Sequence, residues 1–323
     1  MLPAYLEPVA YDRQLHQFLA RYPAYESQRF VYAVDIVGSC NLRCPTCPVA
    51  NSDLQAKEKM SAELFSKVLD KIEAQGPEQR ELWLFNWTEP LLHPQVGELV
   101  ALAKSRGHYV FLSTNLNVPA SRIDEVLKAR PDRLKVSLSS FEQTVYAQTH
   151  VRGNIRKVID NLEFIAQHPD ASEVEVVVGH HLYRNTVDEQ PRIRQFCEQR
   201  GFLYAPATAI VAPLEKLLGY KQGSVERDQL PLVEQLLWDP DQNAALAAAQ
   251  RSGRFDCELR FNMMAINHRA EVMLCCGSVQ PLGHDFLSSD FATLQRHKYN
   301  NAFCKTCIQH DCHLTLSEVT GGS

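Results

Sequence analysis

The sequence predicts an α/β fold in which parallel strands alternate with helices. Six short runs rich in β-branched and aromatic residues recur over residues 30–210, and segments with helical periodicity lie between them. This alternation favours parallel strands joined by right-handed crossover connections. Periodicity alone does not distinguish an open doubly wound sheet from a barrel. The 323 residues are enough for one large barrel, alone or with a small appendage.

The expected strands and helices follow one another in regular order. The strand candidates are FVYAVDIV at 30–37, ELWLFNW at 81–87, YVFLSTN at 109–115, RLKVSLSS at 133–140, VEVVVGHHL at 174–182 and FLYAPATAI at 202–210. The helix candidates, several of which end in Gly or Pro, are 60–75, 96–107, 123–131, 155–168 and 190–201. A mostly helical segment is expected at 211–256, before a cysteine-rich region at 257–312.

Charge and hydropathy narrow the possible partners and the location. The chain has 33 Lys and Arg against 38 Asp and Glu, a net charge of -5, so it lacks the basic field that attracts nucleic acid or anionic lipid. No apolar run approaches the roughly 20 residues that span a bilayer. The N-terminal 23 residues carry charges where a signal peptide needs an apolar core. We therefore expect a cytoplasmic protein with neither nucleic acid nor a membrane as partner.

Ten cysteines in a cytoplasmic chain indicate metal binding or redox chemistry more than disulfides. Three of them, Cys40, Cys44 and Cys47, lie directly after the first predicted strand. In α/β barrels, the loops at the carboxyl ends of the strands build the active site. Three thiolates can hold a four-iron cluster with one iron open, whereas a structural zinc site takes four ligands. Half a zinc site, completed by His16 or another distant residue, is the alternative.

The CxxxCxxC spacing of these cysteines resembles the signature of the radical S-adenosylmethionine (radical SAM) superfamily. The resemblance implies a partial (βα)6 TIM-like barrel and a [4Fe-4S] cluster on Cys40, Cys44 and Cys47, whose fourth iron binds SAM. It also implies reductive cleavage of SAM to a 5′-deoxyadenosyl radical, with a flavodoxin- or ferredoxin-type protein as electron donor. In such enzymes the protein aims the cofactor's chemistry and excludes side reactions.

Polar residues at later strand ends are similar to SAM-binding segments of that family. Glu89 in FNWTEP resembles the acid of the family's Gly-Glu-Pro segment and would hold the SAM ammonium, with Thr88 in place of the usual Gly. The other residues that the resemblance implies in SAM binding are Ser113, Asn115, Ser137, Ser139, Arg152 and the pair Asn185 and Glu189. The alternatives are an N-cap role for Glu89, an exposed helix-start arginine for Arg152, and ordinary loop positions for the Asn185 and Glu189 pair.

Two adjacent histidines, His180 and His181, lie in the fifth predicted strand. Successive residues of a strand point to opposite faces, so one of the two must face the interior of the barrel. We favour a core or polar-lining role for both over a catalytic base.

The C-terminal cysteines resemble the auxiliary-cluster region of the SPASM and twitch branch of the same superfamily. Cys257, Cys275, Cys304 and Cys307 would fully ligate one auxiliary [4Fe-4S] cluster, with Cys312 as a possible replacement for Cys304 or Cys307. Ala270 stands where the branch often has a turn glycine. A four-cysteine zinc site is the alternative. We expect packing roles for Cys197, Cys276 and Cys312 more than a hydrogen-atom donor role.

These observations predict four regions and a small-molecule substrate. The regions are an N-terminal extension (1–29), a radical SAM partial barrel (30–212), a helical linker (213–256) and a twitch/SPASM-like auxiliary-cluster domain (257–323). No leader-peptide-binding domain fits before the first strand, so we expect hydrogen-atom abstraction from a small polar metabolite such as a sugar, nucleoside or natural-product intermediate. Oxidation, epimerisation or rearrangement would follow. A peptide-modifying maturase and a zinc-stabilised interaction module are the alternatives.

Overall fold

The structure is a computed structural model that describes residues 30–49, 55–78, 80–224, 235–236, 257 and 259–316. The N-terminal extension and most of the 213–256 linker lie outside the described residues, so the four predicted regions stay a prediction. Among the residues that are described, no helix is both long enough and apolar enough to cross a bilayer.

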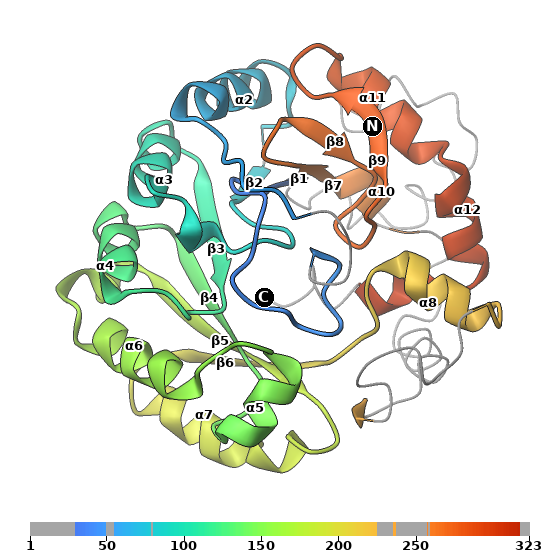
Figure 1. Ribbon diagram of the computed structural model, residues 1–323. Coiled ribbons are helices and arrows are strands. Elements are labelled where there is room, and N and C mark those ends of the chain that lie inside the picture. The colour runs from blue at the N-terminus through green and yellow to red at the C-terminus, as the bar shows by residue number, and fades with distance from the viewer. Residues whose placement is uncertain are drawn as a thin grey trace.

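One sheet of nine strands forms the centre of the described part of the chain, in the order β6-β5-β4-β3-β2-β1-β7-β8-β9. Strands β1 to β6 are parallel, and each of β1 to β5 pairs with the strand that follows it in sequence. Their bounds are β1 Phe30–Val34, β2 Arg80–Trp83, β3 Tyr109–Thr114, β4 Arg133–Leu138, β5 Glu175–Leu182 and β6 Leu203–Thr208. Figure 1 shows them as an open arc, which confirms the predicted α/β partial barrel.

Helices cover the outer side of this arc (Figure 1). They are α2 Ala62–Gln75, α3 Val96–Ser105, α4 Ala120–Ala129, α5 Gln143–Thr149, α6 Ile155–Gln167 and α7 Gln190–Glu198, with short 3-10 helices at η4 Pro90–Leu92, η5 Pro169–Glu173 and η6 Val187–Glu189. Helix α8 Leu214–Lys221 lies apart from them, beside the C-terminal helix α12 Ala302–Gln309. The five helices expected up to residue 201 are present. Two begin at side-chain caps, because Ser61 accepts a hydrogen bond from the Leu64 N–H and Asn154 accepts one from the Lys157 N–H.

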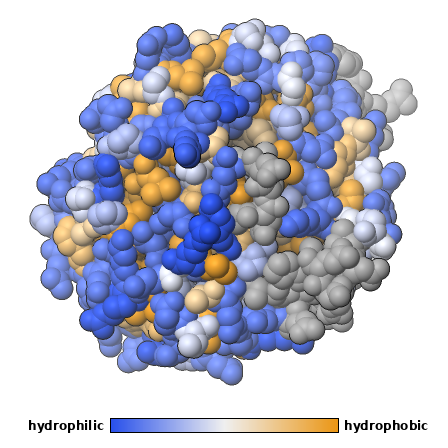
Figure 2. Space-filling view, viewed as in Figure 1, coloured by the Kyte–Doolittle hydropathy of each residue, from blue (hydrophilic) through white to orange (hydrophobic). Residues whose placement is uncertain are grey.

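Alternate residues of the parallel strands face two apolar layers. On β1, Tyr32 and Val34 pack in the layer beneath the helices, whereas Val31 and Ala33 pack inside the barrel with Trp83. Burial on both faces explains why β1 reads as a continuous apolar run, FVYAV, whereas β4 alternates between buried apolar and half-buried polar residues. The helices turn their polar sides outward, and the face in Figure 2 is mostly hydrophilic between smaller hydrophobic areas.

The C-terminal region extends the same sheet. Strand β7 pairs in parallel with the free edge of β1, and β8 and β9 continue from it as antiparallel strands. The elements are α10 Leu259–Asn262, β7 Met263–Ile266, β8 Glu271–Met273, β9 Pro281–Asp285, α11 Phe291–Tyr299, α12 Ala302–Gln309 and the 3-10 helix η9 Cys312–Leu316. The sequence did not predict this continuity, because pairing with a strand more than 200 residues earlier leaves no local pattern.

The turn between β7 and β8 contains Ala270 in a left-handed conformation, with φ of 64°. Its N–H donates to the Asn267 carbonyl at 2.9 Å. The left-handed region costs a residue other than Gly roughly 1–2 kcal/mol, which explains why Gly is usual in such a turn. The Ala270 side chain is fully buried in the outer layer beside Phe286, so packing of its methyl group offsets part of that cost.

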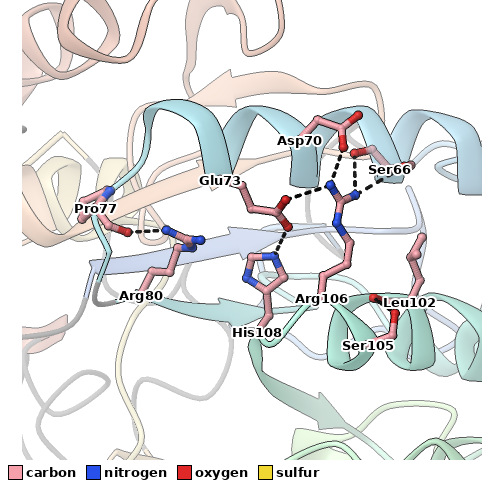
Figure 3. A network of polar contacts seen from close by, with 9 residues as sticks. All are labelled: Ser66, Asp70, Glu73, Pro77, Arg80, Leu102, Ser105, Arg106 and His108. Carbon is pink, nitrogen blue, oxygen red and sulfur yellow. Dashed lines mark hydrogen bonds and ion pairs between the residues drawn. The ribbon is translucent and has the colours of Figure 1, made fainter.

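A polar network fastens α2 to the end of α3 and the start of β3. Figure 3 shows the Arg106 guanidinium between Asp70 and Glu73, with His108 on the other side of Glu73. The distances from Glu73 to Arg106 Nη2 and to His108 Nε2 are both 2.9 Å. Burial lowers the pKa of His108, and its contact with Glu73 opposes that shift. The network lies at the amino end of β3. It therefore stabilises the packing of α2 against α3 and lies away from the loops at the carboxyl ends of the strands.

Candidate active site

The loop that follows β1 crosses the centre of the arc at the carboxyl ends of the strands, as the blue segment in Figure 1 shows. Its first residues pair with a returning segment, in an antiparallel bridge between Val37 and Lys59. The Gly38 N–H donates to the Glu58 carbonyl at 3.0 Å, and the Ala56 N–H donates to the Gly38 carbonyl at 2.7 Å. This short ladder fixes the base of the loop that carries Cys40, Cys44 and Cys47.

Gly38 is required at this base because no side chain fits. A Cβ atom there would lie 2.8 Å from the Ala56 carbonyl oxygen and 2.8 Å from His268 Cε1. Gly38→Ala is therefore expected to destabilise the protein by about 1–3 kcal/mol and to lower its iron content after anaerobic reconstitution. Urea unfolding and iron counting measure the two effects.

Gly107→Ala is the matched control for this prediction. Gly107 has φ of 80° with open space around it, so alanine there strains the backbone without touching the cysteine loop. We expect lower stability with unchanged iron content. Wild-type iron content in Gly38→Ala would contradict the prediction.

Loops after β2 and β3 hold the cysteine loop from one side. The Glu89 N–H donates to the Ser39 carbonyl at 3.1 Å, and the Cys47 Sγ lies 3.9 Å from the Trp87 carbonyl oxygen. The Asn115 Nδ2 lies 3.6 Å from the Cys40 Sγ. The amide of Asn115, which the resemblance implies in SAM binding, thus contacts a cysteine sulfur, and its contact with SAM stays a prediction.

Two further loops hold it from the other side. The Arg43 N–H donates to the Val151 carbonyl at 3.0 Å, and the Tyr183 hydroxyl forms a hydrogen bond with the Thr46 side chain. Tyr183 follows β5 directly and is 3% exposed. Sequence reasoning missed Tyr183, since nothing local distinguishes it from other buried tyrosines.

The three cysteine thiols share one poorly solvated environment. Burial raises the pKa of Cys40 to about 12, and the nearby Glu89 carboxyl adds to the shift. Burial also raises the pKa of Cys44, with further contributions from Cys47 and Cys40, so the sulfurs lie within electrostatic reach of one another. Iron is bound by thiolates, whereas burial favours the neutral thiols. The thiols therefore lose their protons when iron binds and its positive charge replaces them. The donor set fits an iron–sulfur cluster.

Glu89 is buried beside this loop, with 2% of its surface exposed. Its Oε1 accepts hydrogen bonds from the Leu91 N–H at 3.1 Å and the Thr114 hydroxyl at 2.8 Å, and its Oε2 accepts one from the Asn115 N–H at 2.8 Å. Burial raises its pKa to about 7. Glu89 thus caps η4, as the alternative interpretation expected, and also lies where it acts electrostatically on Cys40.

Asp35 organises the FNWTEP loop and was missed in the sequence. Its Oδ1 accepts hydrogen bonds from the backbone N–H groups of Asn86 at 2.9 Å, Trp87 at 3.3 Å and Thr88 at 3.2 Å, and from the Thr88 hydroxyl. Thr88, which stands at the family's usual glycine, therefore uses its side chain to bind Asp35. The signal was available, because an acid at the end of a buried apolar strand needs several donors.

Trp87, in the same FNWTEP loop, carries a buried hydrogen-bond donor. Its indole Nε1–H is buried and has no hydrogen-bond partner among the residues that the structure describes. A buried polar group without a partner is costly, so a bound group that accepts this hydrogen would stabilise the loop. This observation also fits a site built to hold a cofactor.

The remaining residues that were predicted to contact SAM differ in burial and in their position on the barrel. Ser113 on β3 and Ser137 on β4 lie half-buried on strands that form the barrel wall. Ser139 is fully buried, and its hydroxyl contacts Thr149 and lies 3.0 Å from His150 Nδ1. Arg152 is exposed, with φ of 72°, directly after the Val151 carbonyl that binds the cysteine loop. Their contacts with SAM stay a prediction.

Asn185 and Glu189 do not come together in the structure. The exposed Asn185 amide lies 3.2 Å from Gln148 Oε1, whereas the Glu189 carboxylate binds the Ser140 hydroxyl and the Phe141 N–H, the latter at 2.9 Å. Glu189 therefore holds the loop between β4 and α5.

The two strand-β5 histidines face opposite sides, as alternation predicted. His180 is fully buried and contacts the Tyr204 hydroxyl at 2.9 Å on the helix side of the sheet. His181 faces inward, where its ring is stacked 6.0 Å from the His150 ring, and His150 is in turn stacked 4.5 Å from Tyr146. Burial lowers the pKa of His181 well below its usual value and that of His150 to about 4. Both are suited to remain neutral at pH 7.

The auxiliary cysteines gather in the inner apolar layer next to α8. Cys275 follows β8, Cys304 and Cys307 lie one helical turn apart on α12, and all three are buried. Cys307 forms a hydrogen bond with Cys312, which raises its pKa together with burial and the nearby Cys257. No group of three or more His, Cys, Asp or Glu side chains among the described residues is close enough to hold a single metal ion. To bind one metal ion, the cysteine sulfurs would have to move closer together. A four-iron cluster is larger than a single ion and needs less movement.

Lys298 supplies a buried positive charge to this region. Its ammonium is fully buried and donates to the carbonyls of Leu259, at 2.6 Å, and Met263. Burial lowers its pKa to about 8, whereas the thiolates of Cys275 and Cys304 would raise it. An anionic cluster on these sulfurs would balance the charge, so the residues present fit one.

Comparisons with known proteins agree with this site. Residues 34–193 match the family model of the radical SAM superfamily. The chain is 29% identical over 168 residues to a tungsten-containing aldehyde ferredoxin oxidoreductase cofactor-modifying protein of Pyrococcus furiosus, covering 48% of this chain and 45% of that protein. It is 27% identical over 150 residues to the GTP 3′,8-cyclase of Chlorobaculum tepidum, covering 44% of each. The chain thus spans about half the length of these curated relatives.

Solved structures share the fold over most of the chain. Streptococcus suis SuiB bound to its precursor peptide SuiA superposes with a TM-score of 0.60 at 10% identity, covering 91% of this chain and 70% of that one. The protein anSMEcpe with bound AdoMet superposes with a TM-score of 0.55 at 13% identity, covering 85% and 82%. The family match begins at the last residue of β1 and ends within α7, and three cysteines follow β1, so the chain carries a radical SAM domain over residues 34–193, the domain of a superfamily of iron–sulfur enzymes.

Proposed function

We propose that Cys40, Cys44 and Cys47 hold the SAM-binding [4Fe-4S] cluster, and that the enzyme abstracts a hydrogen atom from a small polar metabolite. The observation that carries this proposal is the convergence of the three half-buried cysteines with loops from β2, β3 and β5 at the carboxyl ends of the barrel strands. When bound, the cluster and SAM together supply a 5′-deoxyadenosyl radical. An external flavodoxin- or ferredoxin-type protein would supply the electron, and the cytoplasmic location stays a prediction.

This chain's own residues would orient SAM and keep water from the reacting atoms. Glu89 offers a buried carboxylate for the SAM ammonium, and Asp35 holds the loop that carries it. Ser113 and Ser137 would contribute hydroxyls on the wall of the barrel, and Arg152 lies at its rim. The aromatic cluster of Trp83, Phe85 and Phe111 fills the other side of the interior with apolar surface.

We further propose that Cys257, Cys275, Cys304 and Cys307 hold one auxiliary [4Fe-4S] cluster. Three of these cysteines, Cys257, Cys275 and Cys304, lie within electrostatic reach of the buried Lys298, which supports the proposal because a four-thiolate cluster is anionic. Folds of this kind host many reactions, so the fold alone does not select the substrate class. SuiB, whose structure was solved with a precursor peptide, keeps a peptide substrate as the second candidate.

The test uses deuterium transfer. The reconstituted enzyme is incubated with reductant, SAM and a perdeuterated cell extract divided into small-molecule and peptide fractions, and 5′-deoxyadenosine is analysed by mass spectrometry. We expect deuterium in 5′-deoxyadenosine with the small-molecule fraction. Transfer only with the peptide fraction would favour the second candidate, and the absence of SAM cleavage under any condition would refute the proposal.

Glu89→Gln tests the proposed SAM contact. The amide keeps the size of the side chain but removes the negative charge, so SAM should bind roughly tenfold more weakly or worse, while the iron content stays near wild type. Equilibrium binding of SAM to the reconstituted protein measures this. Equal SAM affinity in both proteins would show that Glu89 serves only as the cap of η4.

A further inference from the structure

Lys135 lies on β4 and faces the interior of the barrel. The register of the sheet places it beside Ser113 of β3 and Val177 of β5. Paired residues of parallel strands point to the same side of the sheet, so Lys135 shares the face of Ser113. The side chain is half-buried, and it forms no hydrogen bond or ion pair with any residue in the described part of the chain.

The ammonium points toward the carboxyl ends of the strands. The Lys135 stem packs over Gly179, where an added Cβ would overlap the lysine Cε and lie 3.4 Å from Cδ and Cγ. Gly179 pairs with Ser137, which is two residues nearer the carboxyl end of β4 than Lys135. The lysine therefore rises about 6–7 Å, from its own layer to the layer of Ser137, which is one residue before the carboxyl end of β4.

Nearby charged groups do not neutralise Lys135. Arg133 forms an ion pair with Glu175 lower on the same wall, and Glu81 accepts a hydrogen bond from the Trp83 indole at 3.0 Å. Burial lowers the pKa of Lys135 and the positive charge of Arg133 adds to this shift, with no acid opposing it. A partly buried ammonium without a counter-charge is costly in the empty protein. An anion that enters the barrel would remove this cost.

We propose that Lys135 binds an anionic group of the substrate, a carboxylate or a phosphate, inside the barrel. The proposal rests on one part of the proposed function, namely that the substrate binds inside the barrel. It narrows the substrate class from polar metabolites in general to acids. The glycine at 179 is part of the site, because only the absence of a side chain there leaves room for the lysine stem.

The test measures anion binding separately from SAM chemistry. The reconstituted enzyme is titrated with orthophosphate, with succinate and with the neutral analogue succinamide at constant ionic strength, and binding is read from the shift in melting temperature. The variants are Lys135→Met, which removes the charge, and Gly179→Ala, which keeps the charge but displaces the side chain. Lys128→Met, at an exposed lysine paired with Asp124 on α4, is the control.

We expect phosphate or succinate, but not succinamide, to stabilise the wild type, with the tighter anion indicating the group on the substrate. Apparent affinity should fall roughly tenfold or more in Lys135→Met and Gly179→Ala and stay unchanged in Lys128→Met, with SAM affinity unchanged throughout. No anion binding by the wild type, equal binding by Lys135→Met, or loss of SAM affinity in Lys135→Met would overturn the proposal. Anion binding without any SAM cleavage would count against the proposed function alone.

Discussion

Replacing Cys40, Cys44 and Cys47 together with alanine is expected to remove about four irons per chain and to abolish reductive SAM cleavage. The three thiols lie on one loop whose contacts with Glu89, Trp87 and Asn115 leave no other cysteine near it among the described residues. No remaining ligand could rescue the cluster there. Iron and acid-labile sulfide analysis of anaerobically reconstituted protein, followed by a 5′-deoxyadenosine assay under dithionite, measures both effects.

Cys197→Ala provides the matched control for this triple variant. Cys197 is fully buried on α7, in the apolar layer outside the barrel, and burial raises its pKa to about 11. Its replacement should cost some packing energy but leave iron content and SAM cleavage at wild-type levels. Unchanged SAM cleavage in the triple variant would contradict the assignment of these cysteines, whatever its iron content.

The parallel half of the fold could be predicted because its signals are local. Each strand from β1 to β6 falls within a short run rich in β-branched and aromatic residues, and the five expected helices carry helical periodicity. Helix α5 was missed because its seven residues, QTVYAQT, are mostly polar and too few for a period to appear. The pairing of β7 with β1 was also missed, because it depends on which sheet edge is free after the barrel has formed.

The candidate site could be predicted only where its functional residues lie within one short segment of the sequence. The CxxxCxxC loop and Glu89 each follow a strand directly, so position and residue type together indicated them. Asp35 and Lys135 depend instead on neighbours brought by other strands, Asp35 on the backbone of residues 86–88 and Lys135 on Gly179 of β5. Ala270 is an intermediate case. The resemblance indicated a turn at this position, and the structure has a left-handed conformation there, although alanine does not favour that conformation.

The double variant Cys304→Ala with Cys307→Ala is expected to lose roughly half of the iron, to keep SAM cleavage without substrate, and to lose product formation. The two cysteines lie on one face of α12, which is separated in sequence from Cys275 after β8. Iron content, 5′-deoxyadenosine formation and product analysis measure the three effects. Cys276→Ala is the control, because Cys276 is buried beside Cys275 but is not proposed as a ligand.

The expected iron loss follows from the removal of two of the four proposed ligands. The cluster would also join α12 to the turn after β8, so a metal site there would contribute directly to the stability of these two segments, whereas β7 is held by its pairing with β1. Without the thiolates, Lys298 would keep its bonds to the Leu259 and Met263 carbonyls but lose the anion that balances its buried charge. The region should therefore loosen, while the loop of Cys40 on the far side of β1 keeps its own contacts. Full iron content in the double variant, or zinc in place of iron in the wild type, would contradict an auxiliary iron–sulfur cluster at these cysteines.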